Sequence, residues 1–171
     1  HEWGVPLHDE HRLFELLCLE GAQAGLSWIT ILKKREGYRE AFDNFDKEKI
    51  CRYGDGDISR LLSNSKIVRN KLKVRAVIQN ARCVLQLYDS GSTLDEFLWR
   101  YVDGQPVQNS WKTMSEIPAS TKLSERISKD MKKLGFKFVG PTICYAYMQS
   151  MGMVNDHIVD CFRYEQIKKM G

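Results

Sequence analysis

The sequence lacks three features that would assign the protein to a special class. Its 171 residues include no apolar run near the roughly 20 residues that a membrane-spanning helix needs. The five cysteines are odd in number and form no Cys-x-x-Cys pair, which excludes a complete disulfide framework and favours a reducing compartment. Nothing near His1 resembles a secretory signal peptide. We therefore expect a soluble, cytoplasmic protein.

The sequence also lacks a strong excess of charge. Lys and Arg number 26 against 22 Asp and Glu, which leaves a net charge of +4. A balance of this size permits a nucleic-acid partner only if the basic residues gather on one face. The length suits one domain over residues 1–171, with no internal repeat.

Apolar residues recur at helical spacing along nearly the whole chain, and alternating strand patterns are scarce. The sequence therefore predicts an all-α fold. Helices are expected over residues 10–20, 26–42, near 50, 58–62, 72–88, 93–101, 121–134, 141–151 and after 155, with 72–88 as a central core helix. The expected N-terminal caps are Asp9, Asp46, Asp57, Ser92 and, for the last helix, Asn155 or Asp156.

Residues 121–152 are expected to form a helix, a glycine-bounded hairpin and a second helix. The two glycines permit positive φ and a close approach of the backbone, so amide groups at the start of the second helix could face a phosphate. The residues predicted to bind a DNA backbone are Lys132, Lys133, Gly135, Lys137 and Gly140. The alternative is an ordinary αα-hairpin with a glycine cap.

A second basic stretch runs from Lys66 to Arg82 and contains no acidic residue. Such a stretch favours contact with a nucleic-acid backbone when it occurs beside a basic hairpin. The alternative is a solvated helix face.

Glu20 is the candidate acidic group. Its neighbours are apolar or small, and no Lys or Arg occurs between Arg12 and Lys33. A carboxylate without a local cation, partly removed from water, is typical of a functional site. The alternative is an exposed glutamate near a helix end. Trp28 is either a core residue or a wall on which a base stacks.

His157 and Cys161 stand four residues apart, which on a helix would present an imidazole nitrogen and a thiolate to one ion. Two ligands make half of a zinc site, and the alternative is a chance spacing.

Several stretches together carry a resemblance to a known family. They are Glu2-Trp-Gly-Val-Pro6, Phe14 to Trp28, Ile31 to Glu36, Gly135 to Gly140 and Val154-Asn-Asp-His157. Over essentially the whole chain the sequence resembles the bacterial 3-methyladenine DNA glycosylase I family. The resemblance implies the all-helical fold of the helix-hairpin-helix glycosylases, hydrolytic excision of 3-methyladenine from double-stranded alkylated DNA, and a structural zinc that ties the N- and C-terminal segments together.

The resemblance also implies roles for individual residues. Glu20 matches a glutamate that contacts the base, and Trp28 matches a tryptophan that stacks on it. His157 and Cys161 match two of four zinc ligands, and the other two are expected from a segment before His1. Phe138-Val-Gly140 departs from the wider superfamily, which has a glycine at the first of these positions.

The resemblance implies a bacterial cytoplasmic enzyme without a lyase step, because no lysine stands where bifunctional relatives form a Schiff base. We expect a monomer, which suits an enzyme that scans DNA. Asp156 is the nearest counterpart of an aspartate that follows the hairpin in the wider superfamily and stabilises the sugar cation or activates water. It lies closer to the hairpin than usual and beside a zinc ligand, so we expect it to act as a helix cap. Two further classes stay open at this point: a helix-hairpin-helix module that binds DNA without base release, and a purely structural metal protein.

Overall fold

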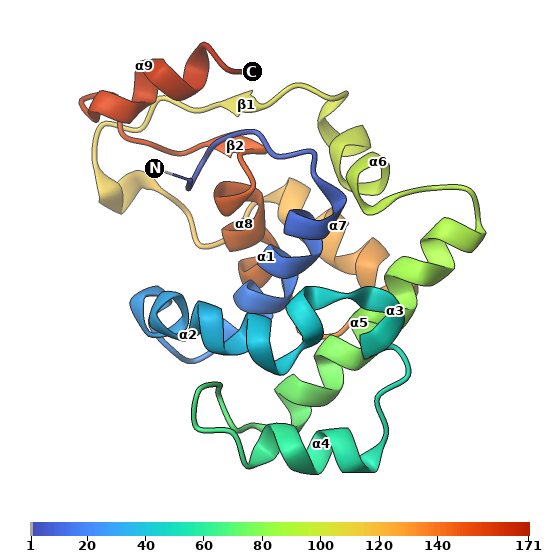
Figure 1. Cartoon of the computed structure of the whole chain (residues 1–171). Helices are drawn as coiled ribbons and strands as arrows, with labels where there is room; N and C mark the ends of the chain where they lie inside the picture. The colour runs from blue at the N-terminus through green and yellow to red at the C-terminus, as the bar shows by residue number, and fades with distance from the viewer. Residues whose placement is uncertain (1) are drawn as a thin grey trace.

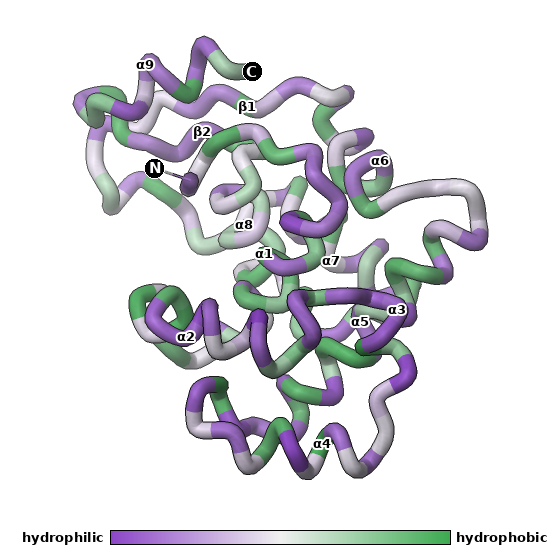
Figure 2. Tube along the Cα trace, in the orientation of Figure 1, coloured by the Kyte–Doolittle hydropathy of each residue, from purple (hydrophilic) through white to green (hydrophobic). Residues whose placement is uncertain are grey.

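Helices surround α1 (Glu10–Gln23) in the structure, a computed structural model that describes residues 2–171 (Figure 1). The helix α1 contacts α2 (Trp28–Ala41), α5 (Lys71–Asp89), α6 (Leu94–Trp99) and α8 (Pro141–Ser150). It is buried around most of its circumference, and the part of α1 at the centre of the molecule is green in the hydropathy view (Figure 2). A helix that is apolar on most sides belongs in the core.

The remaining elements complete the outer parts of the molecule. They are η1 (Asp43–Phe45), α3 (Lys47–Ile50), α4 (Asp55–Leu62), η2 (Arg100–Val102), β1 (Val107–Gln108), η3 (Met114–Glu116), α7 (Lys122–Lys133), β2 (Val154–Asn155) and α9 (Phe162–Lys168). No helix within residues 2–171 is long and apolar enough to cross a bilayer.

The predicted all-α fold is confirmed as a mostly helical one. The only strands among the described residues are β1 and β2, which pair in parallel with Val107 opposite Val154. The predicted core helix 72–88 is α5, whose inward face contributes nine buried residues.

Two of the predicted caps are confirmed, and two lie elsewhere. The Asp9 side chain accepts from the Arg12 amide at 2.8 Å, and Asp46 caps α3. Thr93, rather than Ser92, caps α6. Gly54, rather than Asp57, precedes α4, because Asp57 occupies the third helical position and its carboxylate accepts from the Gly54 amide.

The prediction for the last helix is wrong. Residues 156–161 are irregular, and α9 starts at Phe162 after an N-cap at Cys161. Asp156 therefore caps no helix.

The N-terminal segment runs along the end of α8. The Gly4 amide donates to the Ser150 carbonyl at 3.4 Å, and the Leu7 amide donates to the Met151 carbonyl at 3.0 Å. These bonds bring the beginning and the last third of the chain to one side of α1 (Figure 1).

Candidate functional site

Glu20 lies in the last part of α1, and its side chain is almost fully removed from water, with 3% exposed. Burial raises the pKa of the Glu20 carboxyl to about 7, and a hydrogen bond with the Ser150 side chain acts in the opposite direction. Within residues 2–171, no arginine or lysine forms an ion pair with it. Glu20 also lines a cavity of about 180 Å³ between the α1–α2 loop and the start of α8. The predicted desolvated carboxylate is confirmed.

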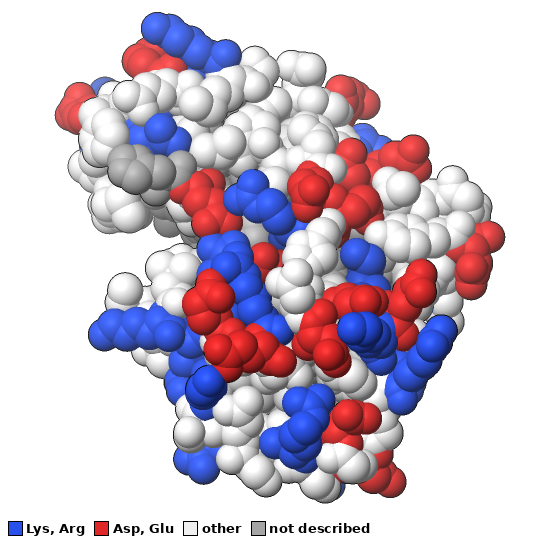
Figure 3. Space-filling view, viewed as in Figure 1, with Lys and Arg blue, Asp and Glu red and all other residues white. Residues whose placement is uncertain are grey.

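Trp28 begins α2, after Ser27 caps the helix through its hydroxyl. It lines a second cavity of about 190 Å³ together with Trp3 and Ser150. Ser150 lines this second cavity and bonds to Glu20, which lines the first. The cavity beside the carboxylate and the cavity beside the two indoles are therefore neighbours. In the space-filling view, the molecule is notched at the left between α2 and the part that holds both chain ends (Figure 3).

A network of ion pairs closes this site on the side of α2. The buried Glu15 carboxylate accepts from Arg35 Nε at 2.7 Å and from Arg39 Nε at 2.8 Å. Arg35 also donates to both oxygens of Glu2, at 2.7 and 2.9 Å. The segment that carries Trp3 is thereby fixed to the helix that carries Trp28.

The same arginines set the protonation of both glutamates. Hydrogen bonds from Arg35 lower the pKa of Glu2 to about 2. Burial alone would raise the pKa of Glu15, but the hydrogen bonds from Arg35 and Arg39 outweigh it and lower the pKa. Both carboxylates are therefore ionised at neutral pH, where Glu20, with a pKa of about 7, is only partly ionised.

The predicted hairpin is present between α7 and α8. Gly135 has a φ of +93°, as expected, and Pro141 is the first residue of α8. Gly140 differs from the expectation, because its φ is −62°. A Cβ at Gly140 would meet nothing within 4 Å, so the absent side chain leaves open space in front of the first turn of α8.

The hairpin lysines differ in their contacts. Lys132 and Lys137 are exposed, whereas Lys133 forms an ion pair with Asp130 at 3.3 Å. The turn therefore joins exposed positive charge to the unpaired amides of a helix N-terminus.

The second basic stretch does not form one continuous binding face. Lys66 pairs with Glu40 at 2.5 Å, Lys73 donates to two carbonyls at the end of α1, and Arg82 donates to the Cys51 carbonyl at 3.1 Å. Acidic and basic side chains also interleave on the face that Figure 3 shows. The sequence interval alone could not reveal these partners, because each lies in another element.

His157 and Cys161 are close together, although not through a helix. Cys161 Sγ lies 3.6 Å from His157 Nδ1, and the loop before α9 brings the two side chains together. His157 Nε2 is buried without a hydrogen-bond partner, and the ring packs edge-on against Trp3. Within residues 2–171, no group of three or more His, Cys, Asp or Glu side chains could hold a metal ion.

Asp156 is buried, and both of its carboxylate oxygens accept hydrogen bonds from other side chains. One carboxylate oxygen accepts from Asn109 and Trp111, each at 2.7 Å, and the other accepts from Tyr145 and Gln149. Both oxygens therefore point into the protein, which makes Asp156 a structural anchor of the loop before His157.

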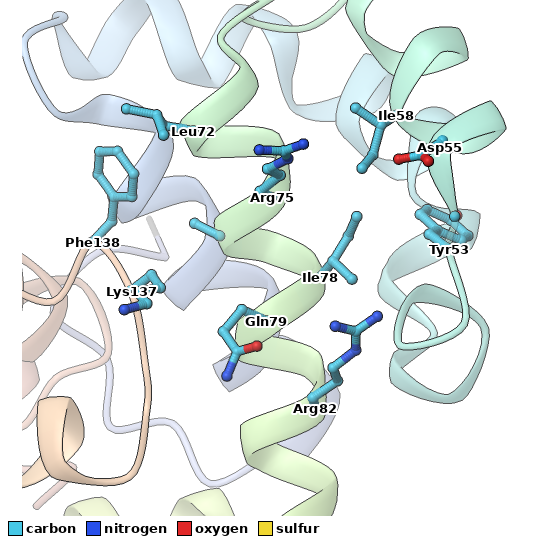
Figure 4. A pocket seen from close by; sticks show the side chains of 12 residues that line it. Tyr53, Asp55, Ile58, Leu72, Arg75, Ile78, Gln79, Arg82, Lys137 and Phe138 are labelled. Carbon is cyan, nitrogen blue, oxygen red and sulfur yellow. The ribbon is translucent and has the colours of Figure 1, made fainter.

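A larger cavity, of about 590 Å³, lies elsewhere, along the exposed side of α5 (Figure 4). Lys137 and Phe138 of the hairpin form one wall, and Tyr53 and Ile58 form the other. Neither Glu20 nor Trp28 lines it, so size alone does not identify the chemical site.

Sequence reasoning did not single out Trp3, Ser150 and Arg35 as site residues. Trp3 lies in a stretch that carries the family resemblance, which was the available signal. Ser150 and Arg35 had none, because their roles arise from contacts between distant segments.

Comparisons with known proteins assign the chain to a family. The model of the methyladenine glycosylase family matches residues 1–164. The chain is 51% identical to DNA-3-methyladenine glycosylase 1 of Escherichia coli, covering 96% of this chain and 88% of the relative. It is 47% identical to DNA-3-methyladenine glycosylase of Haemophilus influenzae, covering 94% and 86%.

Solved structures give the same result. A crystal structure of 3-methyladenine DNA glycosylase I is 51% identical and superposes with a TM-score of 0.93, covering 95% of this chain and 89% of the other. A variant of such an enzyme in complex with 3-methyladenine is 38% identical, with a TM-score of 0.92 and coverages of 95% and 87%. This chain therefore belongs to the methyladenine glycosylase family.

Proposed function

We propose that the protein excises 3-methyladenine from alkylated double-stranded DNA by hydrolysing the N-glycosidic bond. The observation that carries the proposal is the buried Glu20 carboxyl, which has no cationic partner and lies next to a cavity bounded by two indoles. A cationic base can fill the role of that missing partner. The relatives that bear this activity in their names support the substrate.

Excision of this base depends more on recognition of the alkylated base than on activation of the leaving group. Adenine alkylated at N3 carries a positive charge and leaves the sugar more readily than a normal base. Glu20 accepts from the edge of the flipped base and stabilises its charge, and Trp28 stacks on the ring. The bond between the sugar and the base breaks, the base leaves as neutral 3-methyladenine, and water adds hydroxide to the sugar and releases a proton.

The hairpin holds the DNA backbone in this proposal. The open space in front of Gly140, the first-turn amides of α8 and the exposed Lys132 and Lys137 suit a phosphate. Lys133 contributes less, because Asp130 already pairs with it. No lysine stands at the end of the hairpin in the position where bifunctional relatives form a Schiff base, and we assign the protein no lyase step. A monomer suffices for this arrangement.

We also propose a structural zinc at His157 and Cys161. His157 and Cys161 would hold the ion through an imidazole nitrogen and a thiolate, which are ligand types that zinc prefers. Cys161 Sγ and His157 Nδ1 lie 3.6 Å apart, so both would face the same ion. A full site needs two more ligands, which residues 2–171 do not supply. Zinc here would tie the loop before α9 to the rest of the protein.

Chromatography of the bases released from methylated duplex DNA tests the reaction. The proposal predicts free 3-methyladenine and intact strands after incubation with the wild-type protein. A protein that only binds DNA releases no base, and a lyase also cuts the strand, which a denaturing gel detects. Absence of released 3-methyladenine would overturn the proposal.

A further inference from the structure

Helix α5 touches both parts of the site that the proposed function assigns to DNA and to the base. Its N-terminal half lies beside the end of α1, and its middle lies beside the hairpin (Figure 4). Because α5 is a long helix with nine buried residues, it provides a rigid support between these two parts.

Three side chains of α5 hold the backbone of the hairpin. Asn80, which is 4% exposed, donates to the Lys137 carbonyl at 3.0 Å and accepts from the Lys137 amide at 2.8 Å. Gln79 donates to the Gly135 carbonyl at 3.4 Å, and Cys83 Sγ donates to the Leu134 carbonyl at 3.3 Å. The reciprocal pair from Asn80 fixes Lys137 in both distance and direction, because it engages the amide and the carbonyl of one residue.

The same helix holds the end of α1. Lys73 Nζ donates to the Ala22 carbonyl at 2.9 Å and to the Ala24 carbonyl at 2.5 Å. These carbonyls have no partner within their own helix, and Lys73 satisfies them where the chain leaves Glu20 and turns towards Trp28.

The hairpin also meets α1 directly beside the key carboxylate. A Cβ built at Gly21 would lie 3.3 Å from Phe138 Cβ, so the tip of the hairpin packs closely against the residue that follows Glu20. Phe138 takes a φ of +54° to do so. A backbone of this kind in a non-glycine residue requires surrounding contacts to hold it, and the Asn80 bonds to the preceding residue supply them.

We propose that α5 sets the position of the DNA-binding hairpin relative to the base pocket, with Asn80 and Lys73 as positioning residues. Neither residue needs to touch the substrate. The inference rests on the proposed function, since it assigns a cause to the geometry of that site. The two residues therefore affect different steps. Asn80 controls binding of the DNA backbone, and Lys73 controls the placement of the flipped base.

Asn80→Ala tests the first half by two binding measurements. Anisotropy with a labelled 20-bp duplex, repeated over a range of salt concentrations, measures backbone binding. Calorimetry with free 3-methyladenine measures the base pocket. We expect duplex affinity to fall at least tenfold and the salt dependence to weaken by about one phosphate contact. The affinity for the free base should stay within twofold.

Asn155→Ala is the matched control. Asn155 is a fully buried amide that donates to Gln108 Oε1 at 3.0 Å and to the Tyr164 carbonyl at 3.2 Å, in β2. The variant removes two side-chain hydrogen bonds away from the hairpin. The affinity for the duplex and its salt dependence should stay those of the wild type. Equal losses in both variants, or no loss in Asn80→Ala, would overturn the role of Asn80.

Lys73→Met tests the second half and remains informative if Asn80→Ala fails to fold. Methionine keeps the apolar stem and removes the donor. We expect kcat for base release to fall at least tenfold, with duplex affinity within twofold of that of Lys71→Met, an exposed neighbour that loses the same charge. An unchanged kcat, or a loss confined to duplex affinity, would contradict the inference. The binding experiments on Asn80→Ala do not require base release, so they separate the role of Asn80 from the proposed reaction.

Discussion

At the residue scale, Glu20 and Glu15 lie on the same helix and are both buried, yet their surroundings shift the pKa of the two carboxyl groups in opposite directions. Arg35 and Arg39 lower the pKa of Glu15, whereas burial raises that of Glu20 to about 7. The difference follows from their partners, because Glu15 accepts from two guanidinium groups, whereas Glu20 bonds to the uncharged hydroxyl of Ser150. A buried carboxyl left without a cation is destabilising unless a ligand supplies the charge.

Glu20 therefore makes stability depend on pH in a defined window. Its pKa is raised on folding, so the folded state binds the proton more tightly, and stability falls as pH rises from about 4.5 to about 7. The rise in pKa corresponds to about 3 kcal/mol. Urea unfolding should show Glu20→Gln gaining about that much relative to the wild type between pH 4.5 and pH 8.

Glu40→Gln provides the control for this measurement, because Glu40 is an exposed residue paired with Lys66. Its effect should be small and nearly equal at the two pH values. The lowered pKa values of Glu2 and Glu15 act below the window, since their stabilisation is lost only as pH falls below about 4.5. A Glu20→Gln difference that does not change with pH would contradict the assignment.

At the element scale, the packing of α1 against α2 depends on the buried Glu15 carboxylate. Glu15→Gln keeps the shape and removes the charge, so Arg35 keeps Glu2 and Arg39 keeps Glu36, but both lose the charge of the buried carboxylate. Hydrogen bonds to charged groups contribute about 1.5–3 kcal/mol, so urea unfolding at pH 7 should show a loss of this size. Glu36→Gln removes an exposed partner of Arg39 and should cost less than about 1 kcal/mol. Similar losses in the two variants would contradict the importance of the buried network.

The elements also show what a sequence can predict. The core helices and the caps at Asp9 and Asp46 follow from local patterns, and the structure confirms them. The last helix was predicted wrongly because Asp156 looks like a cap, although its carboxylate binds side chains from a loop and from α8. These donors are distant in sequence, so no local pattern reveals them.

The residues of the candidate site also differ in whether the sequence could predict them. Glu20 was predictable because the absence of nearby cations is visible in the sequence. Ser150 and Arg35 were not, since each acts by bonding to a segment far along the chain. The reciprocal bonds between Asn80 and the hairpin belong to the same class.

At the scale of the whole molecule, the candidate site is built around α1 from segments that lie far apart in the sequence. The N-terminal segment supplies Trp3, α2 supplies Trp28 and the end of α8 supplies Ser150. A metal that ties the end segments together would stabilise this arrangement as a unit.

The zinc proposal predicts the metal content of the natural protein. Elemental analysis should give about one zinc per chain in the wild type and a substantial loss in Cys161→Ser, because a hydroxyl binds zinc more weakly than a thiolate. Cys51→Ser, at a half-exposed cysteine in another element, should keep the metal. A wild-type protein without stoichiometric zinc would contradict the proposal.

The most direct test of the central claim is the release of 3-methyladenine from methylated DNA by Glu20→Ala, measured by chromatography against the wild type and Glu40→Ala. Circular dichroism establishes that each variant is folded. The account predicts that Glu20→Ala loses at least a hundredfold in the rate of release, which corresponds to about 2.7 kcal/mol of transition-state stabilisation, while Glu40→Ala keeps the wild-type rate. Release by folded Glu20→Ala at the wild-type rate would contradict the role given to this carboxylate.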